Sequence, residues 1–146
     1  MPDTIRERCV QALMARLQSI TGFPGLAVLR QPDQEIETYP ALALFEGDQT
    51  EDDSFSQVLM RDLEIRVEAW VEAASPTLAR QALEQLSAEV EQKFDADVTL
   101  GGLAFDLVRG GEQTEMAQDG SVSVAAGLIT YTLRYQTRRG DPFTAA

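Results

Sequence analysis

The segment from Leu59 to Glu72 alternates apolar and polar residues along its length, and this pattern limits what the chain can fold into. The apolar positions are Leu63, Ile65, Val67, Ala69 and Val71, and the positions between them are Asp62, Glu64, Arg66, Glu68, Trp70 and Glu72. A period of two is typical of a β-strand that buries one face and exposes the other. The sequence therefore predicts a sheet with one covered face and one polar face.

Two amphipathic helices supply the cover that such a sheet needs. The first predicted helix runs from Thr4 to Thr21, and its Thr4 and Glu7 fit a capping box. The second begins at Ser75-Pro76, with serine as the N-cap and proline at the first helical position, and it ends near residues 95–97. Both apolar stripes have the 3.6-residue period, so we expect the two helices to pack on one face of the sheet.

Shorter patterns complete the predicted order of elements. Besides Leu59–Glu72, strands are predicted at Leu26–Arg30, Ala41–Glu46, Gly102–Arg109 and Ser121–Gln136. Flexible loops are predicted at about 47–56 and 110–120, and a C-terminal tail at about 138–146. The order α-β-β-β-α-β-β predicts one α+β domain over residues 1–146, with a mostly antiparallel sheet and both helices on one face.

Charge and residue usage exclude several classes of function. The 24 acidic residues outnumber the 12 basic ones, which gives a net charge of −12 that repels phosphate and disfavours nucleic-acid binding. The chain has no histidine, the commonest general base and metal ligand. Its one cysteine, Cys9, forms no intrachain disulfide or thiolate cage, and we expect it to be buried. We predict no enzymatic activity, no cofactor, no metal, no signal peptide and no membrane span.

An acidic cluster leaves one alternative to a purely structural role. Asp48, Glu51, Asp52 and Asp53 fall in one predicted loop, where carboxylates could hold a hard cation weakly. The cluster lacks the ligand spacing and the glycine of a calcium loop, so a solvated loop is the expectation. A divalent-metal-dependent binding or enzymatic α+β domain stays open as an alternative.

Trp70 and the basic end of the chain are the candidates for contacts with other chains. Trp70 occupies the polar side of its strand, where a subunit contact and local cover by a loop or by the C-terminal tail are equal alternatives. Residues 129–146 hold three arginines against Asp141, whereas residues 31–72 hold 12 acidic residues against Arg61 and Arg66. Opposite charges on two surfaces suit a head-to-tail contact, which closes into a ring where the rotation permits.

Four short motifs resemble the tail terminator proteins of long-tailed bacteriophages and prophages, the minor tail protein U group. They are Ile5-Arg6-Glu7-Arg8 in the opening helix, Tyr39-Pro40-Ala41-Leu42, the alternating segment from Leu63 to Trp70, and Tyr135-Gln136-Thr137-Arg138-Arg139-Gly140-Asp141-Pro142-Phe143 near the end. The resemblance extends over nearly the whole chain. It implies a sheet with two helices on one side, in agreement with the order of elements above.

The resemblance also implies a function in virion assembly. Six copies would form a ring that caps the tail tube, stops its polymerisation and offers a surface to the head. The implied partners are further copies of the chain, the tail tube protein and a head completion or connector protein, with DNA only passing through the lumen. The implied location is the head-proximal end of the virion tail, after assembly in the bacterial cytoplasm. A head–tail connector or stopper protein is the nearest alternative.

Two sets of residues are predicted to serve such a ring on physical grounds. Subunit or tube contacts are predicted for Trp70, Arg134, Arg138, Arg139 and Phe143, so replacing Arg138 and Arg139 by Glu should weaken association. A negative lumen would keep the genome from sticking as it passes. Its candidate residues are Asp48, Glu51, Asp52, Asp53, Asp62, Glu64 and Glu68.

Overall fold

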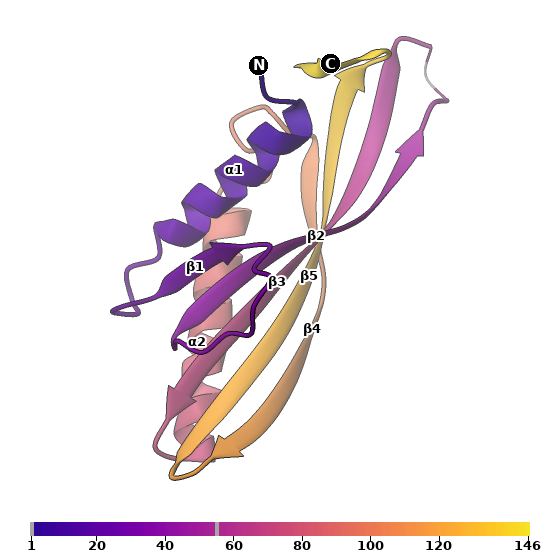
Figure 1. Cartoon of the computed structure of the whole chain (residues 1–146). Helices are drawn as coiled ribbons and strands as arrows, with labels where there is room; N and C mark the ends of the chain where they lie inside the picture. The colour runs from indigo at the N-terminus through magenta and orange to yellow at the C-terminus, as the bar shows by residue number, and fades with distance from the viewer. Residues whose placement is uncertain (1, 55) are drawn as a thin grey trace.

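The alternating segment is the central strand of a twisted sheet that two helices cover on one face (Figure 1). A computed structural model describes residues 2–54 and 56–146; Met1 and Phe55, the latter inside the predicted loop at 47–56, lie outside the described residues. The elements are α1 (Ile5–Gln18), β1 (Ala27–Arg30), β2 (Ala41–Asp52), β3 (Val58–Ala73), α2 (Pro76–Asp95), β4 (Asp106–Asp119), β5 (Val122–Arg138) and β6 (Asp141–Ala145). The predicted α+β class and the predicted order up to β5 are confirmed.

Strand pairing makes the sheet mostly antiparallel, as predicted. Within the described residues, the strand order is β1-β2-β3-β5-β4, with β6 pairing beside the end of β5. Among the strand pairs of the described residues, the short pair of β1 and β2 alone is parallel. The β3–β5 pairing runs without a break from Val58 opposite Arg138 to Ala73 opposite Ser123, so side-chain parity is kept along the whole central pair.

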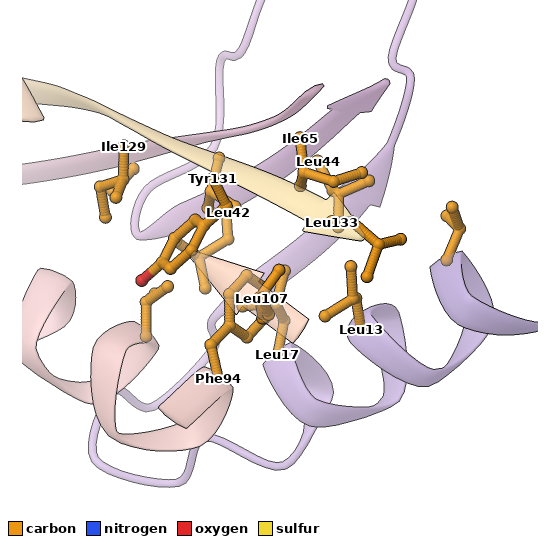
Figure 2. Close-up of a cluster of buried hydrophobic side chains, with 14 of the residues drawn as sticks. Leu13, Leu17, Leu42, Leu44, Ile65, Phe94, Leu107, Ile129, Tyr131 and Leu133 are labelled. Carbon is orange, nitrogen blue, oxygen red and sulfur yellow. The ribbon is translucent and has the colours of Figure 1, made fainter. Parts of the chain in front are cut away.

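The core lies between the helices and one face of the sheet. Figure 2 shows Leu13 and Leu17 of α1 and Phe94 of α2 pointing at the strands. The strand residues that meet them include Leu42, Leu44, Ile65, Ile129, Tyr131 and Leu133, all fully buried. Cys9 is fully buried as predicted, and desolvation raises the pKa of its thiol to about 11. Burial of this apolar set is the main force holding the two layers together.

The predicted helix starts are confirmed, with one change at the first. The Thr4 hydroxyl accepts from the Glu7 amide and the Ser75 hydroxyl accepts from the Leu78 amide. The Glu7 carboxylate does not complete a capping box, because it binds the Arg30 guanidinium at 2.7 and 2.8 Å instead. The same guanidinium holds the pKa of Glu7 below its usual value. This ion pair fastens α1 to β1.

Three segments predicted as loops or tail belong to strands. β2 continues to Asp52, β4 continues through residues 110–118, and the supposed tail contains β6. The pairing register shifts between Glu46 and Gln49 in β2 and between Arg109 and Gly111 in β4, and each shift contains a glycine, Gly47 and Gly110. The predicted start of the fourth strand at Gly102 is also wrong, because the chain turns there and β4 begins at Asp106. Pairing with β3 and β5 overrides the polar composition of these segments.

Arg16 joins the two helices, and its removal is expected to destabilise the fold. Its Nη1 donates to the backbone oxygen of Asp97 at 2.6 Å and lies near the last carbonyls of α2. Arg16→Met keeps the aliphatic stem but leaves these carbonyls unpaired, so the free energy of unfolding should fall by about 1.5–3 kcal/mol. Urea denaturation measures this change. The matched control Arg8→Met, at an exposed site, should stay within about 0.5 kcal/mol of the parent; equal stability of the two variants would contradict the assigned role.

Candidate assembly surface on the free face of the sheet

The helices leave one face of the sheet uncovered, and this face is acidic. We call it the free face. It consists of every second residue of each strand, in step with Asp62 on β3, Arg134 on β5, Asp106 on β4 and Asp52 on β2, which lie on the same side of the sheet. The carboxylates on it are Asp52, Asp62, Glu64, Glu68, Glu72, Asp106 and Glu115, and its basic residues are Arg66, Arg134 and Arg138. Near β1 another segment crosses it, where residues 32–38 line a cavity with Ala27, Leu29 and Ala41.

Ion pairing relieves only part of this negative charge. Arg134 lies 3.4 Å from Asp62, and Arg66 lies 3.5 Å from Glu64. Both pairs are well exposed, so each contributes little to stability. Within residues 2–54 and 56–146, Glu68, Glu72 and Glu115 have no ion pair. The free face therefore keeps a net negative potential.

The structure brings together some of the predicted lumen residues and separates others. Asp52, Asp62, Glu64 and Glu68 share the free face. Glu51 points to the helix-covered side, where it pairs with Arg61 at 2.9 Å. The exposed Asp48 sits in the register shift of β2, and Asp53 follows the end of that strand.

The acidic cluster does not assemble into a cation site. Among the described residues, no three Asp, Glu or Cys side chains converge as ligands of a metal ion. The carboxylate of Asp52 instead accepts hydrogen bonds from the hydroxyl and the amide of Ser54, which lower its pKa.

Trp70 borders a groove of about 240 Å³ on the free face. Glu68 and Trp70 of β3 form one wall, Gln113 and Glu115 of β4 form the other, and Ala126, Gly127 and Leu128 of β5 lie between them. The Trp70 Nε1 is buried and finds no hydrogen-bond partner among the described residues. Cover by the C-terminal tail is wrong, because β6 pairs with Thr137 and Arg138, about 36 Å along β5 from Ala126.

The other predicted interface residues lie at the opposite end of the sheet from Trp70. Arg138 is exposed at the last position of β5, and Phe143 is 42% exposed on β6. The Arg139 side chain binds within its own chain, where it donates to the backbone oxygens of Ser56 at 3.1 Å and Asp53 at 2.7 Å. A double reversal of Arg138 and Arg139 would therefore disturb the β2–β3 hairpin as well as any subunit contact.

Charges that are far apart in the sequence become neighbours in space. The acidic end of β2 and the basic end of β5 lie at the same end of the sheet, where Asp62 pairs with Arg134 and Arg139 holds the backbone of Asp53. The charge asymmetry along the sequence is therefore only partly a separation in space. Arg138 and the groove carboxylates Glu68 and Glu115 still lie at opposite ends of the free face.

A second groove was not predicted from the sequence. It encloses about 410 Å³ between α2 and the helix-covered side of β4, and it includes Leu83, Ser87, Arg109 and Met116. The Ser87 hydroxyl is buried there and finds no partner in the part of the chain that the structure describes. Arg109 is held by Glu91 and Glu112 at 2.9 Å each. Sequence reasoning missed this groove because its outer wall was predicted to be a loop.

Fold and surface together define an α+β domain with an open acidic sheet face. None of the helices described is long and apolar enough to cross a membrane. No protein-family model and no curated protein matches the chain. Among solved structures, a chain of the "Virion of native gene transfer agent (GTA) particle" is similar over 90% of this chain and 92% of its own length, with 10% identity and a TM-score of 0.37.

Proposed function

We propose that the protein is a structural virion protein whose copies form a ring on the end of a phage tail tube, stop its polymerisation and provide the head-joining surface. The observation that carries the proposal is the acidic free face, which supports the motif resemblance to tail terminators. In a ring with this face inward, carboxylates would meet the passing DNA and repel its phosphates. The helices would then lie on the outside of the ring.

The twist of the sheet allows one face to serve two purposes. β3 and β5 contain 16 and 17 residues, so the right-handed twist accumulates along them and the two ends of the free face point in different directions (Figure 1). The end with Asp62 and Arg134 can line a channel while the end with Trp70 meets a neighbouring copy. The predicted lumen and contact residues are therefore compatible on one sheet.

Open strand edges support assembly with further chains. Among the described strands, β4 has a neighbour on one side only, and its residues 110–118 are exposed. β1 pairs with β2 only from Ala41 to Leu44, and just beyond it the Gln31 side chain accepts from the Glu46 amide, so β1 covers only a short part of that β2 edge. Such edges present unpaired backbone groups that another chain can bind. The partners we propose are further copies of the chain, the tail tube protein and a head completion protein, at the head-proximal end of the tail.

Binding to purified virion parts tests this function. The protein should bind one end of tails from the particles that encode it, appear there as a ring by negative-stain microscopy, and bind tailless filled heads much more weakly. Binding to such heads alone would instead assign the connector or stopper role. Failure to bind either part, together with a melting temperature that rises with divalent cations, would overturn the assembly function.

A further inference from the structure

We propose that the Trp70 groove of one copy binds the Arg138 side chain of the next copy, and that this head-to-tail contact closes the ring. The inference rests on the proposed ring and adds the two patches that meet. The groove and Arg138 lie near opposite ends of the same sheet face, so a copy cannot satisfy the contact by itself.

The groove has the chemistry of a guanidinium site. The indole of Trp70 supplies an aromatic surface, and Glu68 and Glu115 place a carboxylate on each wall. Neither carboxylate has an ion pair within the described residues, so both can receive a cation from outside. The small residues Ala126 and Gly127 leave space above β5. Arginine combines stacking on an aromatic ring with hydrogen bonds to carboxylates.

Arg138 is the arginine best presented to such a groove. Three exposed arginines, Arg8, Arg80 and Arg138, have no ion pair in the described parts of the chain. Arg8 and Arg80 lie on helices, and Arg80 precedes Glu84 by one turn. Arg138 stands at the end of β5, on the free face, where its backbone is fixed by pairing with Val58.

Neighbouring contacts make this presentation rigid. The backbone amide of Arg139 donates to Gln57 at 3.0 Å, and its side chain holds the backbone of Ser56 and Asp53. A side chain on an ordered strand loses less entropy on binding than one on a mobile tail.

The separation of the two patches decides the kind of assembly. Gly127 and Arg138 are 11 positions apart on β5, which corresponds to about 36 Å. A contact between two different patches is heterologous, and it produces either a closed ring or an open filament. Each copy would then give one arginine and receive one, as a ring of identical copies requires.

Solution mass and tryptophan fluorescence test the contact with four variants. Arg138→Ala lacks the arginine, and Glu68→Gln with Glu115→Gln lacks the groove charges; each should weaken self-association at least about tenfold. Arg8→Ala and Arg80→Ala are matched controls that should assemble like the parent. Because each of the first two variants keeps one working patch, an equimolar mixture should give two-copy complexes and no rings.

Titrating unassembled protein with an arginine derivative, and recording tryptophan emission, tests the groove without the subunit contact. Trp70 is the only tryptophan of the chain, so its emission reports on this place. N-acetylarginine amide should change the emission saturably in Arg138→Ala and not in the Glu68→Gln, Glu115→Gln variant. Lysine amide should bind more weakly, because it cannot stack or form two parallel hydrogen bonds.

The outcomes separate this inference from the proposed function. Rings of Arg138→Ala that form and cap tails as the parent does would overturn the contact and leave the capping function standing. An equal loss in Arg80→Ala would also overturn it, because the effect would then be one of net charge. If the parent neither forms rings nor binds tails, the capping function fails, and an emission unchanged by arginine amide would overturn the groove as an arginine site.

Discussion

Phe94→Ala is expected to lower the free energy of unfolding by about 3–5 kcal/mol, more than any surface change in this chain. Phe94 is fully buried in the last turn of α2, and its ring packs edge-to-face on Tyr131 of β5, with centroids 4.9 Å apart and planes at 65° (Figure 2). Leu17 of α1 and Leu107 of β4 belong to the same cluster. The substitution therefore opens a cavity where four elements meet.

Thermal and urea unfolding measure this loss. For a domain of this size, 1 kcal/mol corresponds to about 2–4 °C, so the melting temperature should fall by about 6–20 °C. Phe143→Ala is the matched control, since that phenylalanine is 42% exposed and its loss should cost no more than about 0.5 kcal/mol in the separate protein. A Phe94→Ala variant that unfolds within about 1 kcal/mol of the parent would contradict the central place given to this ring.

The parts of the fold that the sequence predicts correctly depend on local signals. The caps at Thr4 and Ser75 act within three residues, and the alternation along β3 reflects burial of one face. The end of β2 and residues 110–118 of β4 carry polar or small residues on both faces except for Met116, so no period marks them. They are strands because β3 and β5 supply hydrogen-bond partners from distant parts of the sequence.

For the candidate surface too, the sequence predicts what depends on one strand and not what depends on contacts between distant segments. The alternation alone places Asp62, Glu64, Glu68 and Trp70 on one polar face, and the structure confirms this placement. The groove beside Trp70 was not predictable, because its second wall is β4, across the small residues of β5. The anchoring of Arg139 was likewise hidden, since a basic pair at the end of a strand does not reveal which side chain is bound within its own chain.

If the proposed ring surrounds passing DNA, reversing the charge of the free face is expected to make it hold DNA instead of releasing it. Asp62→Lys together with Glu64→Lys raises the net charge from −12 to −8 and places both new ammonium groups on the free face. In a six-copy ring this adds a dozen cations around the channel. With about six phosphate contacts, affinity for duplex DNA should fall about 10³-fold between 50 and 200 mM salt, whereas the parent should not bind.

A variant with the same net charge shows whether the position of the charge matters. Glu84→Lys with Asp95→Lys also gives −8, but both sites are on the exposed side of α2, outside the free face. Mobility-shift titrations over a salt series should therefore detect binding only for the free-face variant, and virions assembled with it should eject their genomes poorly. If the two variants bind DNA equally, or neither binds, the free face does not line the channel. Charges act over about one Debye length, roughly 8 Å at physiological salt, so carboxylates that do not line the channel cannot act on DNA inside it. The acidity would then serve solubility or subunit pairing.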